Sequence, residues 1–213
     1  MGDSSIGYWE TAGATKTYSH PLRQSWLDGV PREARVLDFG CGYGRVMNEL
    51  AGQGFTDLTG VDVSESAVRR GLAASAGLDL RVIAPGAALP FPDGSYDMVL
   101  LFAILTCVPS DAAQEALVAE LIRVLAPGGL LYVSDVSLQD DDRNRARYAA
   151  HAATSPLPYG TFVTDDGGVC RHHEPARLRT LLSECDLLRE ETVLVTTMNG
   201  NSSQALQLLA RKR

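Results

Sequence analysis

One acid and three glycines near residue 40 have the types and the spacing of a ligand-binding turn. Asp38 ends a short apolar segment, and Gly40, Gly42 and Gly44 follow it at every second position. Glycines allow a ligand to approach the backbone N–H groups at the start of the following helix. Asp62 ends a second apolar segment roughly 20 residues later, where a carboxylate can accept two hydrogen bonds from a ribose diol. The spacing therefore predicts a nucleoside-binding site at the carboxyl edge of a sheet.

The elements that must hold these residues alternate along the chain between strand-like and helix-like segments. The expected strands span residues 35–39, 57–62, 80–83, 96–102, 130–135, 191–197 and 205–209. The expected helices span residues 19–28, 44–52, 65–74, 111–125 and 174–183. Asp111 and Gln114 resemble a capping box, and Asn199 with Gly200 is typical of a tight turn between the last two strands. The alternation predicts an α/β fold with a parallel sheet between two helix layers.

The sequence predicts a single domain over residues 1–213, and four stretches of it have different expected roles. Residues 1–34 form an amino-terminal lid and helix, and residues 35–136 form the cofactor-binding core. Residues 138–173 interrupt the alternation with a polar helix at 141–150 and a hairpin around Asp165-Asp166-Gly167-Gly168. This substrate-side insert can fold over the carboxyl edge of the sheet, where doubly wound folds bind ligands. Residues 174–213 complete the domain with a late helix and the final hairpin.

Composition limits the class of protein and of partner. The chain has 213 residues, 45% of them hydrophobic, and a net charge of −7. This content predicts a globular α/β domain, and the negative charge argues against nucleic acid as a partner because phosphate binding needs a basic surface. Four scattered cysteines without a CxxC pair fit a reduced cytoplasmic protein better than a disulfide scaffold or a zinc site. No signal peptide and no membrane-spanning run is recognised, so no membrane partner is expected.

Five segments together resemble the class I S-adenosylmethionine-dependent methyltransferases. They are VLDFGCGYGR at 36–45, GVDVSESAV at 60–68, LPFPDGSYDMVL at 89–100, LIRVLAPGGLLYVSDV at 121–136 and HHEPARLRTLLSECDL at 172–187. The resemblance implies a Rossmann-like doubly wound sheet of seven strands, parallel except for an antiparallel last strand, with the small insert after the fifth strand. It also implies S-adenosyl-L-methionine as cofactor, S-adenosyl-L-homocysteine as product and a small-molecule substrate.

The resemblance also assigns residues to the cofactor. Asp62 would bind both ribose hydroxyls, and Val63 would pack on the adenine. The loop expected to hold the methionine part contains Asp38, Gly40, Cys41, Gly42 and Gly44. The residues expected beside the cofactor after the fourth strand are Phe102 and Ala103.

One segment departs from the family pattern. Pro85 stands where the family commonly has an acid that binds the adenine amino group. Adenine recognition is therefore expected to rest on backbone groups near Ala87 and Ala88. The amino-terminal aromatic residues Tyr8, Trp9 and Tyr18 are expected to close over the site and exclude water, with Tyr18 beside the cofactor.

Methyl transfer from a sulfonium is an in-line displacement that needs no metal ion, so the remaining requirements are positioning and proton removal. His172 and His173 precede the late helix, and a neutral imidazole suits deprotonation of a hydroxyl. A cap or packing role is the alternative for both, and His20 and His151 are weaker candidates. Residues expected to contact the substrate are Tyr8, Trp9, Thr106, Asp135, Tyr159, Asn199 and Asn201.

Structural roles compete with several of these assignments. Asp135 can instead form a cap or an ion pair, and the two asparagines can simply form a hairpin turn. The arginines at positions 143, 145 and 147 can face a substrate anion, but a solvated helix face is the stronger expectation.

The favoured function is methyl transfer to a small metabolite, with a hydroxyl oxygen as acceptor. One alternative is a protein that binds S-adenosylmethionine without transferring the methyl group. The other is a nicotinamide-dependent oxidoreductase, which normally has G-x-G-x-x-G rather than the G-x-G-x-G spacing seen here. The sequence specifies no oligomeric state.

Overall fold

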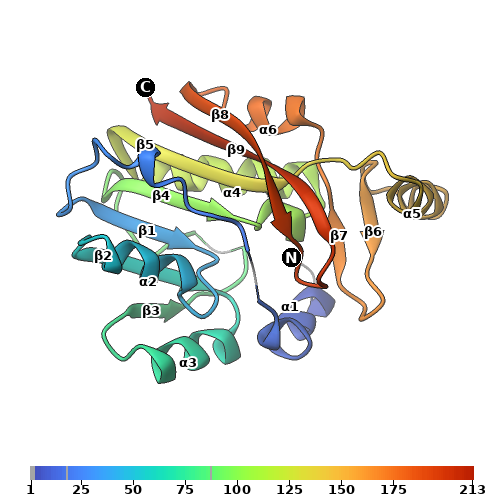
Figure 1. The fold of residues 1–213 in the computed structure, drawn as a ribbon, viewed down its shortest axis with the longest axis horizontal. Helices are drawn as coiled ribbons and strands as arrows, with labels where there is room; N and C mark the ends of the chain where they lie inside the picture. Colours follow the sequence, from blue (N-terminus) through green and yellow to red (C-terminus); the bar gives the residue numbers. More distant parts are fainter. Residues whose placement is uncertain (1–2, 18, 87) are drawn as a thin grey trace.

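The computed structural model describes residues 3–17, 19–86 and 88–213, which fold around one seven-stranded sheet (Figure 1). The strand order is β3-β2-β1-β4-β5-β9-β8. β9 pairs in the antiparallel sense with both β5 and β8, so the other six strands run in one direction. This confirms the predicted fold. The strands are β1 Arg35–Phe39, β2 Asp57–Asp62, β3 Asp79–Val82, β4 Tyr96–Phe102, β5 Leu125–Val136, β8 Cys185–Thr196 and β9 Ser202–Lys212.

Helices cover both faces of the sheet because alternate residues of each strand point in opposite directions. On one face, Leu37 and Val99 pack with side chains of α4 and α6. On the other face, Val36 and Met98 pack with α2 and with Leu27. Figure 1 shows α2 in front of the sheet and α4 behind it. The helices of the core are α2 Arg45–Gly52, α3 Glu65–Ala74, α4 Asp111–Val124 and α6 Pro175–Leu181, with the short 3-10 turn η3 Leu105–Cys107 after β4.

The insert after β5 contains the predicted helix and hairpin. α5 spans Asp142–Ala152, and Asp141 caps it by accepting a hydrogen bond from the Asn144 backbone N–H at 3.0 Å. β6 Thr161–Val163 and β7 Val169–Arg171 form the antiparallel hairpin. Backbone hydrogen bonds between His173 and residues 136 and 138 hold the two ends of the insert together. The insert therefore stands at the carboxyl edge of β5, on the right in Figure 1.

The amino-terminal stretch does not form the helix predicted at 19–28. It contains α1 Asp3–Glu10 and the 3-10 turns η1 Gly13–Thr15 and η2 Gln24–Trp26. Its polar groups bond to the sheet instead. The Ser19 hydroxyl donates to the Thr196 carbonyl at 2.9 Å, and the Arg23 N–H donates to the Tyr132 hydroxyl at 3.1 Å. These tertiary partners, together with Pro21, keep the segment extended.

The capping box predicted at Asp111 and Gln114 is also wrong. Ser110 caps α4, since its hydroxyl accepts from the Ala113 N–H at 3.4 Å. The Gln114 side chain is buried and donates to the Leu105 and Val108 carbonyls at 3.2 and 2.8 Å. Gln114 therefore braces the turn after β4 rather than the helix start.

Candidate functional site

The glycine turn after β1 has the backbone conformation that its sequence predicts. Gly40, Gly42 and Gly44 have φ of 75°, 53° and 79°, a region that favours glycine. A Cβ on Gly40 would lie 2.0 Å from Cδ1 of Ile104, so a larger residue there would also force the Ile104 side chain to move. The Gly40 N–H donates to the Val61 carbonyl at 2.8 Å, which fixes the turn against β2.

Asp62 joins this turn to the start of α3. One carboxylate oxygen accepts from the Gly42 N–H and the other from the Ser64 N–H, both at 2.8 Å. Burial raises the pKa of Asp62, and the backbone N–H groups partly oppose that shift. Each carboxylate oxygen can accept about two hydrogen bonds, so each retains one position for a ligand hydroxyl. The geometry suits a ribose diol.

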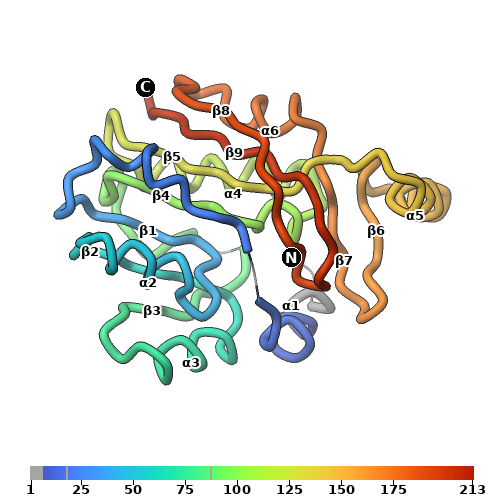
Figure 2. Tube along the Cα trace, in the orientation of Figure 1, coloured from blue at the N-terminus to red at the C-terminus, as the bar shows by residue number. Residues whose placement is uncertain are grey.

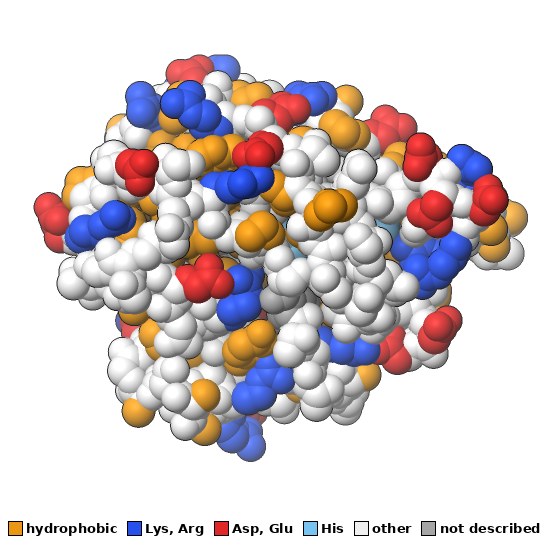
Figure 3. Space-filling view, in the orientation of Figure 1, with side chains coloured by type: hydrophobic (Ala, Val, Ile, Leu, Met, Phe, Trp, Pro, Cys, Tyr) orange, Lys and Arg blue, Asp and Glu red, His pale blue; other side chains and the backbone are white. Residues whose placement is uncertain are grey.

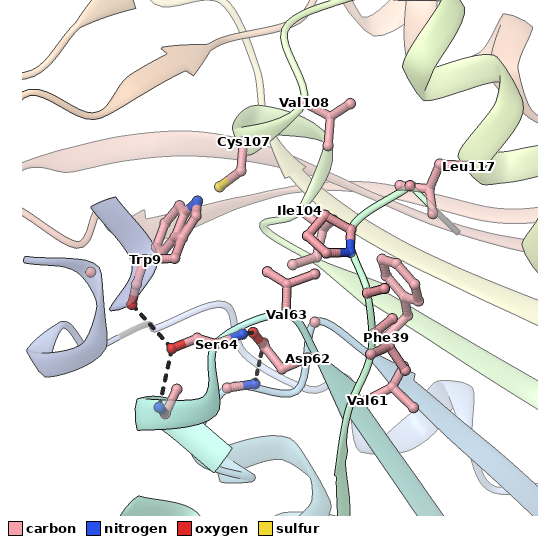
Figure 4. Close-up of a pocket in the computed structure, with 18 of the residues that line it drawn as sticks. Trp9, Phe39, Val61, Asp62, Val63, Ser64, Ile104, Cys107, Val108 and Leu117 are labelled. Carbon is pink, nitrogen blue, oxygen red and sulfur yellow. Dashed lines mark hydrogen bonds between the residues drawn. The ribbon is translucent and has the colours of Figure 1, made fainter. Parts of the chain in front are cut away.

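A cavity of about 470 Å³ opens beside Asp62 (Figure 4). Apolar side chains of Val63, Ile104 and Leu117 face it, with Trp9 on the opposite side (Figure 4). Pro85 also lines it, so no acid stands at that position to bind an adenine amino group. The predicted cofactor residues that line this first cavity are Gly40, Gly42, Asp62, Val63, Ala88, Phe102 and Ala103.

Three predicted cofactor residues lie behind the lining of the first cavity. Cys41 packs in the core with Met47 and Val68, so its side chain has a structural role. Gly44 is the N-cap of α2. Asp38 is buried, and its Oδ2 has no hydrogen-bond partner among the residues that the structure describes. Two further predicted residues, Tyr18 and Ala87, lie outside the described residues.

The buried Asp38 supports the fit of S-adenosylmethionine to the turn. Burial raises the pKa of Asp38 to about 7, with Arg45 opposing the shift and Asp62 adding to it. An acceptor atom without a partner is costly in the interior and fits a hydrogen-bond donor or a positive charge brought by a ligand. The α-amino group and the sulfonium of the cofactor carry such charge. Asp38 itself does not line the cavity, so its contact with the cofactor stays a prediction, whereas Gly40, Gly42 and Asp62 border the space directly.

The amino-terminal segment lines the first cavity with Trp9, Gly13 and Ala14, and its closure over the cofactor stays a prediction. Figure 2 shows α1 between α3 and the turn joining β8 to β9. The Ser64 hydroxyl donates to the Trp9 carbonyl at 3.1 Å, drawn in Figure 4. The Ser66 hydroxyl donates to the Glu10 carboxylate at 2.7 Å, and Arg70 donates to the Ala14 carbonyl at 2.6 Å. The amino-terminal segment is therefore hydrogen-bonded to the first turns of α3.

A second cavity, of about 550 Å³, adjoins the first. Trp9, Ala103 and Cys107 line both. Ala103 has φ of 58°, the one positive value outside glycine in the described part of the chain, and such strain often marks a functional site. The predicted substrate residues that line the second cavity are Trp9, Thr106, Asn199 and Asn201.

Three predicted substrate residues do not line either cavity. Asp135 is fully buried, and its carboxylate accepts from the Thr106 and Val136 N–H groups at 3.1 and 2.8 Å. Tyr159 is 53% exposed and packs on Tyr148 instead. Tyr8 also lies outside the lining, and its hydroxyl donates to Asp166 at 3.3 Å. Asp135 and Tyr8 therefore position a loop and the insert hairpin.

The two predicted catalytic histidines point to different places. His172 lines the second cavity, with Nδ1 2.6 Å from the Tyr148 hydroxyl. Burial lowers the pKa of His172 to about 3, with the Arg147 guanidinium adding to the shift. His173 is only 1% exposed, and its Nε2 lies 2.7 Å from the Gln114 side-chain nitrogen. His173 lines neither cavity, so the structure does not support a catalytic role for it.

The structure adds His20, a weak candidate from sequence, to the second cavity. Its Nδ1 lies 2.8 Å from the Ser134 hydroxyl, and burial lowers the pKa of His20 to about 4. His20 and His172 are therefore both neutral at neutral pH. His20 is 114 positions from Ser134 in the chain, so only the tertiary fold brings them together.

The arginines of α5 also differ from expectation. Arg143 and Arg147 line the second cavity, whereas Arg145 is exposed and pairs with Asp142 at 2.6 Å. Arg143 and Arg145 are exposed, as the predicted solvated face requires, whereas Arg147 is half-buried.

Two classes of feature are missing from the part of the chain that the structure describes. No group of three or more histidine, cysteine or acidic side chains is arranged to hold a metal ion. None of the described helices has the length and apolar character needed to cross a membrane.

Known proteins resemble this chain in sequence and in fold. A family model described as a methyltransferase domain matches residues 37–133. The ubiquinone biosynthesis O-methyltransferase of Ralstonia nicotianae is 30% identical over 177 residues, which cover 76% of this chain and 73% of that protein. The 27-O-demethylrifamycin SV methyltransferase of Amycolatopsis mediterranei is 34% identical over 140 residues, which cover 62% of this chain and 50% of that protein.

A solved structure of an S-adenosylmethionine-dependent methyltransferase from Methanosarcina mazei has the same fold. Its TM-score is 0.83 at 24% identity, and the match covers 90% of this chain and 98% of that one. The segment matched by the family model contains the glycine turn and Asp62, which form the polar part of the first cavity.

Proposed function

Because this chain belongs to the class I S-adenosylmethionine-dependent methyltransferases, we propose that it methylates a small molecule held in the second cavity, at a hydroxyl oxygen. The observation that carries the proposal is the meeting of the two cavities at Trp9, Ala103 and Cys107. The bound cofactor supplies a methyl group on a sulfonium. The residues shared by both cavities mark where an acceptor atom would meet it, and holding both reactants there would lower the entropic cost of the reaction.

His20 is one of the two bases we propose, because a network fixes its ring. The Tyr132 hydroxyl accepts from the Arg23 N–H and donates to Gln207 Oε1 at 3.0 Å. The Gln207 amide nitrogen then donates to Ser134 Oγ at 3.3 Å, and Ser134 contacts His20 Nδ1. Nε2 of His20 has no partner within the described ranges, so it can accept a hydrogen bond from a substrate hydroxyl. The lowered pKa makes the ring a weak base, so the proton would pass to Nε2 as the O–CH3 bond forms and the oxygen becomes strongly acidic.

His172 is the second base. Its Nδ1 contact with the Tyr148 hydroxyl orients the ring, and Thr106, Asn199 and Asn201 offer polar groups to orient the acceptor in the same cavity. The net charge of −7 supports a small-molecule acceptor rather than a nucleic acid. Four free, buried cysteines support the cytoplasm as its compartment.

Two measurements test this function. Calorimetric titration should show binding of S-adenosylmethionine and S-adenosylhomocysteine but not of NAD; NAD binding without S-adenosylmethionine binding would contradict the family's cofactor for this chain. Methyl-labelled cofactor should then label hydroxylated small molecules from a broad pool. Tight cofactor binding without any labelled product would instead favour a binding protein that transfers no methyl group.

A further inference from the structure

We propose that the acceptor carries an anionic group, a carboxylate or a phosphate, and that Arg143 and Arg147 bind it at the α5 end of the second cavity. This inference rests on the function proposed above for that cavity. It names the chemical class of the acceptor and the direction in which the acceptor lies.

Both arginines face the cavity because they are four positions apart, which places them on one side of α5. Neither takes part in a salt bridge with any residue whose position is described. Arg145, between them, points away and has its partner in Asp142. The helix therefore places two guanidinium groups without an ion-pair partner at the second cavity, Arg147 half-buried and Arg143 at its exposed rim.

Arg147 is held in place and partly dehydrated without a counter-ion. Its guanidinium carbon lies 3.4 Å from the centre of the Phe162 ring, and its Nε is buried without a hydrogen-bond partner among the described residues. Burial lowers the pKa of Arg147, and the charge of Arg143 lowers it further. Arg147 is half-buried, so its guanidinium has lost part of its hydration, and a ligand anion would supply the ion pair that the described residues do not.

The acids that line the same cavity do not supply that anion. The Asp166 carboxylate forms an ion pair with Lys16 at 2.5 Å and accepts a hydrogen bond from the Thr164 hydroxyl at 2.6 Å. Asp165 is exposed in the turn of the hairpin, where it forms no salt bridge with a described residue. Guanidinium groups bind carboxylates and phosphates through paired N–H donors, so both anions fit this pair of arginines.

The position of α5 gives the acceptor an orientation. α5 lies at the right end of Figure 1, beyond β6 and β7 and far from β1 and α2. Figure 3 shows Lys and Arg side chains gathered below α5, beside a small patch of His atoms. The anionic group would bind there, and the methyl-accepting atom would lie toward Trp9, Ala103 and Cys107.

Three ligands with the same ring and different head groups test this inference: benzoate, phenyl phosphate and neutral benzamide. Binding is measured by calorimetry on the full chain saturated with S-adenosylhomocysteine. We expect at least one of the two anions to bind at least tenfold more tightly than benzamide, and the stronger of them identifies a carboxylate or a phosphate site. Arg147→Gln should remove this preference, and the matched variant Arg145→Gln on the same helix should retain it.

Equal binding of benzamide and both anions, no binding of any of the three, or a preference that survives Arg147→Gln would each overturn the inference. Binding of S-adenosylhomocysteine is measured first on every sample. If the wild type does not bind S-adenosylhomocysteine, the proposed function is contradicted. If it binds S-adenosylhomocysteine but shows no preference for anions, only the anion site is contradicted.

Discussion

Replacing Asp62 with alanine should weaken cofactor binding by roughly 100-fold. The carboxylate accepts two backbone N–H groups at 2.8 Å and retains one acceptor position on each oxygen for the two ribose hydroxyls. A hydrogen bond to a charged group contributes about 1.5 kcal/mol at the low end of its range, so two contribute about 3 kcal/mol. Since about 1.4 kcal/mol corresponds to a tenfold change in Kd, the expected loss is about two powers of ten.

Calorimetric titration of S-adenosylhomocysteine measures this loss directly, and Asp57→Ala is the matched control. Asp57 is exposed at the opposite end of the same strand, β2, so its replacement should leave the Kd unchanged. Asp62→Ala also removes two backbone hydrogen bonds of the turn. Unfolding without ligand therefore has to be measured separately.

Ligand-induced stabilisation provides the second measurement. At a ligand concentration 100 times the wild-type Kd, the wild type should gain about 2.7 kcal/mol of unfolding free energy, and a variant with 100-fold weaker binding about 0.4 kcal/mol. Equal gains in the two proteins, or a Kd within about threefold of wild type, would refute the assignment of the ribose to Asp62.

Three further predictions concern the same two cavities. Asp38→Asn should make the free energy of unfolding less dependent on pH. The raised pKa means that the folded protein binds the Asp38 proton more tightly than the unfolded chain does. The stability that Asp38 contributes is therefore complete below about pH 4 and is lost as the pH rises to about 7. Urea unfolding of both proteins across that range checks it, and parallel pH curves would contradict it. Gly40→Ala should destabilise the fold by more than Gly42→Ala does. Both positions have positive φ, but only at position 40 would the added Cβ meet a neighbouring side chain. Equal midpoints of thermal unfolding for the two variants would contradict this prediction. His20→Asn and His172→Asn should leave S-adenosylhomocysteine binding intact, and at least one should lower kcat about 100-fold or more once an acceptor is known; full turnover in both would exclude histidine as the base.

The cofactor side could be predicted from sequence because its geometry depends on the backbone. The positive φ values at Gly40 and Gly42 are conformations that few other residues adopt, so glycine at those positions reveals them. The position of Asp62 at the end of β2 follows from the strand pattern alone. Asp135 shows where this reasoning fails. It too lies near the end of a strand, but its carboxylate turns back to bind the Thr106 N–H.

The residues of the second cavity could not be predicted from sequence, because tertiary contacts rather than local sequence patterns bring them together. His172 and His173 are neighbours in extended backbone, so their side chains point in opposite directions, and only the structure shows that His172 faces the cavity. His20 reaches the same cavity because the segment around Pro21 stays extended and bonds to the sheet. Likewise, only the packing of α5 on β6 shows that Arg147 faces inward.

Glu10 connects α1 to α3, because its carboxylate accepts hydrogen bonds at the first turn of α3, from the Ser66 hydroxyl and backbone N–H at 2.7 and 3.2 Å. A carboxylate at this end of a helix satisfies free N–H groups and interacts favourably with the helix dipole. Ser64, whose N–H binds Asp62, caps the same turn. Movement of α1 away from the first cavity would remove part of this cap from α3, beside Asp62. Amide hydrogen exchange at the start of α3 would therefore measure how often α1 leaves this position.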